Sequence, residues 1–313
     1  MSDHPYIIRN YCLEELNALV QFVNEAEKLG ERFTCTTLQD LLESLGLPNH
    51  FPEDNLFIAE RAGKVIGYID VMPELNIGRA VLTCIVHPEN GRLNLYKSLI
   101  ESALHRCEEL QLNVVHANIP QENRRAKRFF SKMGFSFIRR YLELRLDLSR
   151  AHLPNLGKTT FTVRSLRKGE EKTLNQIQNR SFATTWGYNP NTSKDIIYRI
   201  SLPYCSLDDI IMAFDADKPI GYCWTRMNYR EDNAEEGGQG RIYMLGVDPD
   251  YRGKGVGMHV LAVGLSYLKS RGVRIVHLTV DSKNKAARAL YRTAGFEVWK
   301  SSVWYEKVLG TPL

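Results

Sequence analysis

The sequence predicts a mixed α/β (α+β) fold that is present twice in tandem. Apolar strand-like runs alternate with amphipathic helical patterns, and a strand–helix–strand crossover of the kind found in mixed sheets recurs. From Val86 to Phe135 the chain also matches itself without a gap when it is displaced by 161 residues. Upstream, Gly67-Tyr68 matches Gly221-Tyr222 at an offset of 154, so the second half contains an insertion of seven residues within positions 228–240. The paired residues include Val86 and Val247, Pro88 and Pro249, Asn123 and Asn284, Ala126 and Ala287, and Gly134-Phe135 and Gly295-Phe296. Because a repeat this long is a duplicated domain, we expect one domain over residues 1–150 and a second over residues 160–313.

Periodicity places the elements of the first half in a definite order. Apolar runs bounded by turn residues predict strands, and apolar residues at helical spacing predict helices. The expected strands span residues 6–12, 55–60, 65–71, 80–86, 114–119 and 135–148. The expected helices span residues 13–29, 38–45, 93–110 and 124–133.

A linker then precedes a second set of elements in the same order. Residues 149–160 contain Pro154, Asn155 and Gly157 and have no hydrophobic period. The expected strands of the second half span residues 161–164, 210–214, 220–226, 242–247 and 275–280, followed by a terminal β segment that ends at Val308. The expected helices span residues 171–183, 193–200, 257–270 and 284–294.

Size and composition exclude several classes of protein. The 313 residues suffice for two domains of ordinary size, and 43% hydrophobic with 25% charged residues is typical of a soluble globular protein. The net charge of +5 forms no long basic run, so we expect no nucleic-acid partner. No apolar stretch approaches membrane-spanning length and no signal peptide is evident at Met1. The six cysteines show no metal-ligand spacing, so we expect a cytoplasmic protein with free, buried thiols and no metal site.

The segment from Val247 to Gly257 ends a strand and opens a helix. Its glycines stand at positions 253, 255 and 257, where they leave backbone N–H groups unshielded. The helix that follows directs the positive end of its dipole toward the same place, which favours a phosphate. A tight turn would need only one glycine, so Gly253, Gly255 and Gly257 together indicate an anion site, to which Arg252 and Lys254 add positive charge.

Other phosphate-binding loops fit this segment less well. A Walker loop needs Ser or Thr where Gly255 stands, and a dinucleotide fingerprint needs glycine where Val260 stands. The remaining pattern, Arg-x-x-Gly-x-Gly from Arg252 to Gly257, resembles the acyl-CoA-binding loop of the GNAT superfamily of N-acetyltransferases. The residues at that family's spacing further along are Asn284, Ala287, Leu290, Tyr291, Gly295 and Phe296. Within the superfamily, the second half is most similar to the mycothiol synthases, which are also tandem proteins.

The resemblance implies two tandem GNAT domains and acetyl-CoA as cofactor. It implies that the backbone of residues 252–257, Val256 included, grips the pyrophosphate of coenzyme A. It further implies that backbone groups of Leu245 and Val247 bind the pantetheine. Gly246 between them lowers the steric cost of a distortion in that strand. The resemblance also implies that Asn284 and Ala287 border the cofactor.

Tyr291 is the catalytic candidate. The resemblance implies that it acts as general acid toward the departing thiolate, and a phenol with an ordinary pKa of about 10 suits that role. It also lies on one helix face with Ala287, Leu290 and Ala294, so a tyrosine packed between helix and sheet is the alternative interpretation.

The general base is not evident from the sequence. GNAT enzymes often place Glu four or six residues before the valine that matches Val247, where this chain has Tyr243 and Arg241. Neither is an ordinary base at neutral pH. Glu235 and Glu236 lie just upstream in an insertion, where solvated loop charges are the commoner interpretation; a water chain or an amine that arrives neutral are further routes. Because Arg241 replaces the mycothiol synthase Glu, that enzyme's substrate is not carried over.

The acceptor side is expected around the loop between the first two helices of the second half. In the family, this region forms one wall of the acceptor site. Phe182, Trp186 and Tyr188 can form an aromatic pocket there, with Tyr243 beside them. A packed loop with aromatic anchors is an equal alternative. The expected partner is a small-molecule or peptide amine, and the chain is expected to be a monomer or homodimer.

The first copy lacks the chemical parts of the second. Gly91, Asn94 and Tyr96 stand where the second copy has Arg252, Gly255 and Gly257. Side chains at the last two positions would obstruct a pyrophosphate. Phe130, which has no hydroxyl, stands in place of Tyr291. We therefore expect the first domain to be a structural or substrate-shaping partner, with binding of another ligand, or unproductive binding of coenzyme A, as the alternative.

Together these observations predict an acetyl-CoA-dependent N-acetyltransferase whose C-terminal domain transfers the acetyl group to a primary amine by direct attack on the thioester. Two alternatives remain: a non-catalytic sensor that binds acyl-CoA, and a scaffold protein whose fold serves only interaction.

Overall fold

The computed structural model describes residues 6–29, 38–90, 93–151, 157, 159–228 and 238–310. These residues form two compact units, one made of Met1–Arg140 with Ser301–Leu313 and the other of Tyr141–Lys300. Each unit contains a mixed sheet with helices on both faces, which confirms the predicted mixed α/β class.

The sheet of the first unit has the strand order β1-β2-β3-β4-β5-β12, in which only the β4–β5 pair is parallel. One face packs against α1 and α2 around Leu19, Leu41 and Tyr68, and the other against α4 and α5 around Leu99 and Phe130. The strands are β1 (Ile7–Asn10), β2 (Leu56–Arg61), β3 (Lys64–Glu74), β4 (Arg79–Val86), β5 (Val114–Pro120) and β12 (Glu297–Val308). The helices are α1 (Leu16–Lys28), α2 (Leu38–Leu45), α3 (Pro52–Asn55), α4 (Leu93–Glu109) and α5 (Arg124–Lys132).

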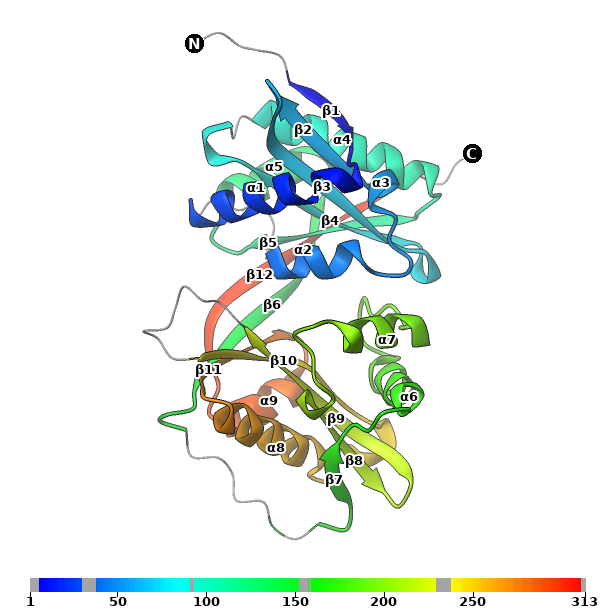
Figure 1. Cartoon of the computed structure of the whole chain (residues 1–313), viewed down its shortest axis with the longest axis vertical. Coiled ribbons are helices and arrows are strands. Elements are labelled where there is room, and N and C mark those ends of the chain that lie inside the picture. The colour runs from blue at the N-terminus through cyan, green and yellow to red at the C-terminus, as the bar shows by residue number, and fades with distance from the viewer. Residues whose placement is uncertain are drawn as a thin grey trace. The chain divides into compact units, whose positions relative to one another are not determined.

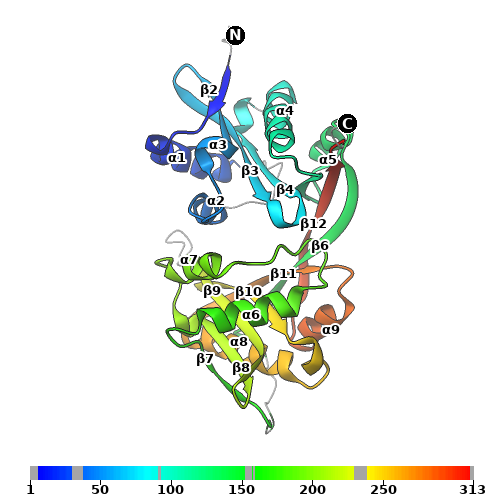
Figure 2. The same cartoon turned by 90° about the vertical axis from the view of Figure 1, so that its right-hand side faces the viewer.

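The second unit repeats this arrangement with the order β6-β11-β10-β9-β8-β7, in which only β10–β11 is parallel. Helices α6 and α7 cover one face around Ile177 and Trp224, and α8 and α9 cover the other around Leu265 and Tyr291 (Figure 2). The strands are β6 (Ser136–Asp147), β7 (Thr162–Ser165), β8 (Ile210–Asp215), β9 (Lys218–Asn228), β10 (Gly238–Val247) and β11 (Val273–Asp281). The helices are α6 (Glu171–Phe182), α7 (Ser193–Ser201), α8 (Val256–Ser270) and α9 (Lys285–Thr293).

The elements expected from periodicity are confirmed, most of them to within about two residues at each end. Local signals explain this accuracy, because the side chains of Asn123 and Asn284 cap α5 and α9 by accepting the N–H groups of Ala126 and Ala287. Two starts differ by more than this. Strand β10 begins at Gly238 rather than at Ile242, because its first residues pair with β11 despite their polar character. Helix α1 begins at Leu16 rather than at Leu13, because residues 13–15 form a 3-10 turn.

Strands β6 and β12 each run from one unit into the other. Residues 141–147 of β6 pair with β11 in the second unit, and residues 302–308 of β12 pair with β5 in the first (Figure 1). The last strand of each repeat therefore completes the sheet of the other repeat. The sequence boundary expected between residues 150 and 160 follows β6 in the chain, whereas the compact units divide inside β6 and again inside β12.

The described cysteines are free, and Cys84, Cys107 and Cys223 are buried as expected. Burial raises the pKa of these thiols, which keeps them protonated. Cys12, at the start of the 3-10 turn that precedes α1, is exposed and Cys205 is only half-buried, contrary to the expectation, and Cys35 lies outside the described residues. Among the helices that the structure describes, none is both long and apolar enough to cross a bilayer.

Candidate active site

The glycine-rich segment forms a turn that opens α8 without a capping side chain. Gly253 and Gly255 have φ of 76° and 83°, left-handed conformations that side chains rarely adopt, and Gly255 is the N-cap residue. Its carbonyl accepts the first helical N–H, from His259, so the N–H groups before His259 have no acceptor within the helix. Residues 252–255 are exposed, so these amides form a suitable cradle for an anion.

Helix α6 holds this loop through charged contacts. The Arg180 guanidinium lies 2.6 Å from a carboxylate oxygen of Asp248 and 2.6 Å from one of Asp250. Burial would raise the pKa of Asp248, but the hydrogen bonds from Arg180 and from the Asp250 N–H outweigh it and lower the pKa. Arg252 donates to the Ser181 carbonyl at 2.8 Å, so its charge stays beside the loop. Lys254 lies over the Tyr251 ring at 4.8 Å.

Strand β10 separates from β11 beside this loop. Residues 238–241 pair with β11, whereas the pairing with β9 continues to Val247. The sheet is therefore open between β10 and β11 beyond Arg241, and we call this opening the split. The β9–β10 register shifts between Ile242 and Met244, so Tyr243 is an extra residue, that is, a β-bulge.

The distortion of β10 thus lies at Tyr243 and not at Gly246, where the sequence placed it. Because of the bulge, Tyr243 and Met244 both pack on the α6 face, while Leu245 and Val247 pack on the α8 face. Gly246 serves a different purpose: a Cβ there would lie 2.6 Å from Tyr222 and 2.8 Å from Ser181. The missing side chain lets α6 pack close to the strand.

The residues expected to bind the cofactor meet on the α8 face of the split. A Cβ on Gly257 would make ordinary van der Waals contact with Val247 at 3.4 Å and with Leu290 at 3.5 Å, so a larger side chain at this position would extend between β10 and α9. Ala287 lines the same cluster half-buried, and Asn284 is exposed at the start of α9, where its side chain caps the helix.

Tyr291 lies in the same cluster and is only 6% exposed. Its ring packs edge-on against Phe296, with the centroids 5.9 Å apart. Burial raises the pKa of Tyr291 above its ordinary value, so the phenol is protonated at neutral pH. This geometry suits a proton donor and equally a packed core residue.

The aromatic residues expected on the acceptor side occupy different surroundings. Tyr188 stacks on Phe182 at 5.3 Å and donates to Asn179 at 2.8 Å, and burial raises the pKa of Tyr188 to about 12. Trp186 lies 6.5 Å from Tyr141, a residue of β6. Tyr188 therefore anchors the loop on Phe182, the last residue of α6, whereas Trp186 lies near Tyr141 of strand β6.

Tyr243 lies within the α6-side cluster of the sheet. Its ring is 5.3 Å from Trp224, and the Arg226 guanidinium lies 3.4 Å from the Tyr243 centroid. Arg241 precedes Tyr243 by two residues on the same strand. The other base candidates, Glu235 and Glu236, lie outside the described residues.

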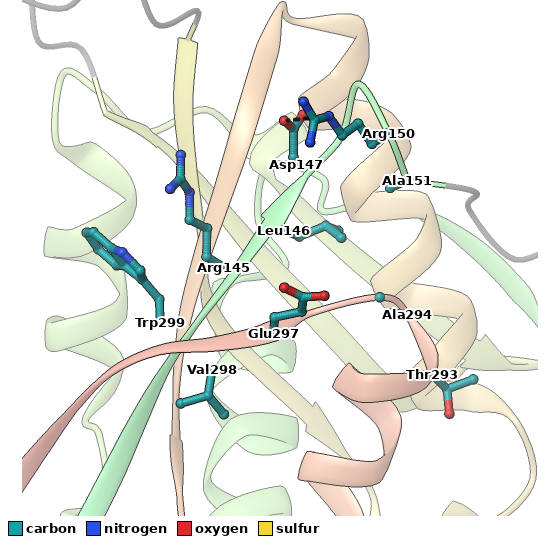
Figure 3. Close-up of a pocket in the computed structure, with 11 residues that line it drawn as sticks. Arg145, Leu146, Asp147, Arg150, Ala151, Thr293, Ala294, Glu297, Val298 and Trp299 are labelled. Atoms are coloured by element: carbon teal, nitrogen blue, oxygen red, sulfur yellow. Dashed lines mark ion pairs between the residues drawn. The ribbon is translucent and has the colours of Figure 1, made fainter.

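A cavity of about 720 Å³ in the second unit was not foreseen from the sequence. It lies between the end of β6 and the start of β12 (Figure 3), and none of residues 252–257 lines it. Its lining includes Arg145, Asp147, Glu297 and Trp299. Sequence reasoning missed it because β6 comes from the other repeat, and pairing between distant strands leaves no local signal.

The described elements match one family model twice. Residues 21–135 and 173–296 match the model of the "Acetyltransferase (GNAT) family". The two matched ranges end at Phe135 and Phe296, the same position of the repeat, and together they cover more than half of the chain.

Curated relatives and solved structures extend this result to the whole chain. A mycothiol acetyltransferase of Stackebrandtia nassauensis is 28% identical over 261 residues, 82% of this chain and 84% of the relative. One of Amycolatopsis mediterranei is 27% identical over 94% of both chains. A tandem GNAT protein from the clavulanic acid biosynthesis pathway shares the fold, with a TM-score of 0.74 at 15% identity, covering 99% of this chain and 100% of that one. So does a GCN5-related N-acetyltransferase of Sphaerobacter thermophilus, with a TM-score of 0.72 at 19% identity, covering 100% and 99%.

Proposed function

This chain belongs to the GNAT acetyltransferase family, and from that premise we propose that its second unit transfers the acetyl group of acetyl-CoA to a primary amine. The observation that carries the proposal is the split: β10 leaves β11 beyond Arg241, beside the glycine-rich start of α8. A backbone edge and a set of helix N–H groups then face one space, which suits a long cofactor that ends in a pyrophosphate.

The residues present fit coenzyme A. The amides of residues 253–258 would hold the pyrophosphate, with Arg252 and Lys254 adding charge beside them. Gly257 places no side chain between Val247 and Leu290, where we propose that the pantetheine chain lies. When bound, acetyl-CoA supplies an activated acetyl group as a thioester.

The transfer requires one bond to form and one to break. The amine nitrogen bonds to the acetyl carbon, the carbon–sulfur bond breaks, and the nitrogen releases a proton. Backbone groups of Leu245 and Val247, on the edge that β11 has left, stabilise charge on the carbonyl oxygen. Tyr291, protonated at neutral pH, gives its proton to the departing sulfur and is later reprotonated.

The amine must be neutral before it attacks. Arg241 and Tyr243 occupy the strand positions of the family's usual base, and a cationic surrounding lowers the pKa of a nearby ammonium. We propose that the acceptor loses its proton to water for this reason, so that no carboxylate base is needed. The rate should then follow the ionisation of the acceptor itself.

Release of free thiol from acetyl-CoA tests this function across a panel of small amines, amino acids and peptides. We expect turnover with part of the panel, and a fall in kcat of about 10²–10³-fold in Tyr291→Phe while the affinity for coenzyme A is retained. Phe130→Tyr, the converse change at the repeat position in the first unit, is the matched control and should leave kcat unchanged.

Two results would favour the alternatives. Tight binding of coenzyme A without thiol release from any amine would indicate a sensor. Gly255→Asp places a side chain at φ 83° in the phosphate cradle and should abolish binding. If that variant retained full biological function, a scaffold role would be indicated instead.

A further inference from the structure

The two units differ at the end of their last helix, beside the glycine that follows it. In the first unit the Lys307 ammonium donates to the Met133 carbonyl at 2.8 Å, at the end of α5. The same ammonium lies 2.9 Å from the Cβ position of Gly134. The last carbonyls of a helix lack partners within the helix and carry the negative end of its dipole, so an ammonium group is stabilised there. The first unit supplies this group from its own chain.

In the second unit the equivalent side chain has no donor. Leu146 stands where the repeat has Lys307, and its methyl carbon lies 3.3 Å from the Cβ position of Gly295. Leucine cannot bind the carbonyl of Ala294, the counterpart of Met133. The cavity of about 720 Å³ lies at this place, and Leu146, Ala294 and Gly295 belong to its lining. The end of α9 therefore offers a position for an ammonium group that the cavity can receive from outside the chain.

A carboxylate adds negative charge at this end of the cavity. Glu297 belongs to the lining, whereas the first unit has Ser136 at its position. Figure 3 shows the Glu297 side chain directed from β12 toward β6. Within the described ranges, Glu297 has no cationic partner within 4.0 Å. Asp147, the other acid of the lining, is already engaged, because its carboxylate accepts the N–H and the hydroxyl group of Ser149. Glu297 is thus available to the ammonium group of a ligand.

The cavity carries positive charge at a second place. Arg145 lines it from β6, and its guanidinium lies 5.7 Å from the ring centroid of Trp299. Both side chains are exposed, and Figure 3 shows them on the same side of β6. In the part of the chain that the structure describes, Arg145 has no carboxylate partner. Arg150, 84% exposed and 4.0 Å from Asp147, is a second cation of the lining. Guanidinium groups bind carboxylates through paired N–H donors, so this part of the cavity suits a carboxylate.

We propose that this cavity is a second ligand site, which binds an amino-carboxylate zwitterion, either a free amino acid or a short peptide. The ammonium group binds the Ala294 carbonyl and Glu297, and the carboxylate binds Arg145. Ala151 and the Trp299 ring supply apolar surface for a side chain, and the volume lies within the roughly 300–1,000 Å³ typical of small-molecule sites. Since none of the residues assigned to the cofactor lines the cavity, the inference is independent of the proposed function.

Isothermal titration calorimetry of the full chain with leucine and with dileucine tests the site without cofactor or turnover. The N-acetyl form of each compound lacks the ammonium charge, and the carboxamide form lacks the carboxylate. We expect saturable binding of at least one zwitterion, with an affinity at least about tenfold higher than that of either matched form, because each form loses a charge-assisted contact. The tighter of the two zwitterions shows whether the site takes a single residue or a peptide. If neither binds, or if the matched forms bind equally well, the proposal is wrong.

Two substitutions assign the two ends of the ligand. Glu297→Gln should weaken the zwitterion about tenfold and leave the N-acetyl form unchanged, because that form has no ammonium group. Arg145→Gln should weaken the zwitterion by a similar factor and leave the carboxamide form unchanged. Arg292→Gln is the matched control, since Arg292 is exposed on the last turn of α9 but does not line the cavity. Binding of the zwitterion that is unaltered in both Glu297→Gln and Arg145→Gln would show that the ligand lies elsewhere.

Leu146→Lys introduces the ammonium group that the first unit has at this place. Its Nζ should bind the Ala294 carbonyl, as Lys307 binds that of Met133, and reduce the affinity for the zwitterion at least about tenfold. Because Leu146 is buried, urea unfolding first establishes that the variant folds, and Glu297→Gln serves as the test if it does not. Full affinity in a folded Leu146→Lys would refute the position given to the ammonium group, whereas thiol release from acetyl-CoA is unaffected by that result.

Discussion

The two units share a frame and differ in the residues that do chemistry. In the first unit Tyr96 stands where the second has Gly257, and its buried ring packs 6.0 Å from Phe129, the counterpart of Leu290. In the second unit Gly257 places no side chain between Val247 and Leu290. The duplicated fold thus places a buried aromatic ring in one copy at the position where the other copy has a glycine.

Both units also have a strand that leaves its parallel neighbour. Strand β4 pairs with β5 only as far as Leu82, and β10 with β11 only as far as Arg241. The register between β3 and β4 is continuous, whereas that between β9 and β10 contains the bulge at Tyr243. The opening is therefore a property of the fold, while the bulge is confined to the unit with the glycine loop.

A pair of histidines makes the sharpest contrast. His116 and His277 occupy the same position of the repeat, as do Glu306 and Arg145. His116 Nε2 lies 2.8 Å from Glu306 Oε2, whereas His277 is paired with Arg145. The exchange of β6 and β12 decides this, because each strand belongs by sequence to the repeat whose histidine it does not contact.

Replacing Gly257 by tyrosine, the residue at the equivalent position 96 of the first unit, tests whether the cofactor needs a glycine here. This substitution should have the largest effect on cofactor binding. In Gly257→Tyr the ring would occupy the space between Val247 and Leu290. We expect the affinity for coenzyme A to fall by at least about a thousandfold, more than 4 kcal/mol, by isothermal titration calorimetry. Tyr96→Phe, in the first unit, should leave it unchanged. Full affinity in Gly257→Tyr would show that the cofactor does not use this space.

A second substitution tests the difference between the two histidines. It replaces Arg145, which lies opposite His277, by glutamate, the residue type that His116 contacts at position 306. In Arg145→Glu, loss of a cation and gain of a carboxylate should raise the pKa of His277 from about 4 toward its ordinary 6.5, as measured by NMR. Because the folded-state pKa is depressed, the unfolded state takes up more protons between pH 6.5 and 4.

The free energy of unfolding should therefore decrease as the pH drops through this window. In the wild-type chain, the contribution of His277 to this decrease should be about 3 kcal/mol. Arg145→Glu should reduce that loss, and urea unfolding at pH 4.5 and pH 7 measures it. Arg150→Glu is the control for added negative charge, and an equal acid loss in both variants would contradict the assignment.

Breaking the contact between Arg180 on α6 and the carboxylates of the glycine-rich loop should have a smaller effect on the use of acetyl-CoA. The first unit has His87 in place of Asp248, whereas Glu89 keeps a carboxylate at the position of Asp250, the second partner of Arg180. In Arg180→Gln the buried Asp248 loses its partner and the loop its anchor, so KM for acetyl-CoA should rise about three- to tenfold with kcat little changed. A KM that does not move would show that the loop is held by its own backbone.

Local sequence signals account for most of what could be predicted. Periodicity located the strands and helices, and the Asn caps and glycines fixed the starts of α5, α8 and α9. The same signals identified the glycine loop and the loss of its parts in the first copy. They did not locate the bulge at Tyr243, since a bulge depends on the register with β9, and they gave no sign of the cavity beside Arg145 and Trp299.

The sequence by itself determined the duplication, the order of the elements and the glycine-rich opening of α8, because each depends on residues that are neighbours in the chain. Only the tertiary structure decided which terminal strand completes which sheet, and hence that Arg145 rather than Glu306 stands beside His277. The two strands occupy equivalent repeat positions, so their local patterns leave the choice open. The pairing partner is set by contacts between residues more than a hundred positions apart, for which the sequence carries no local mark.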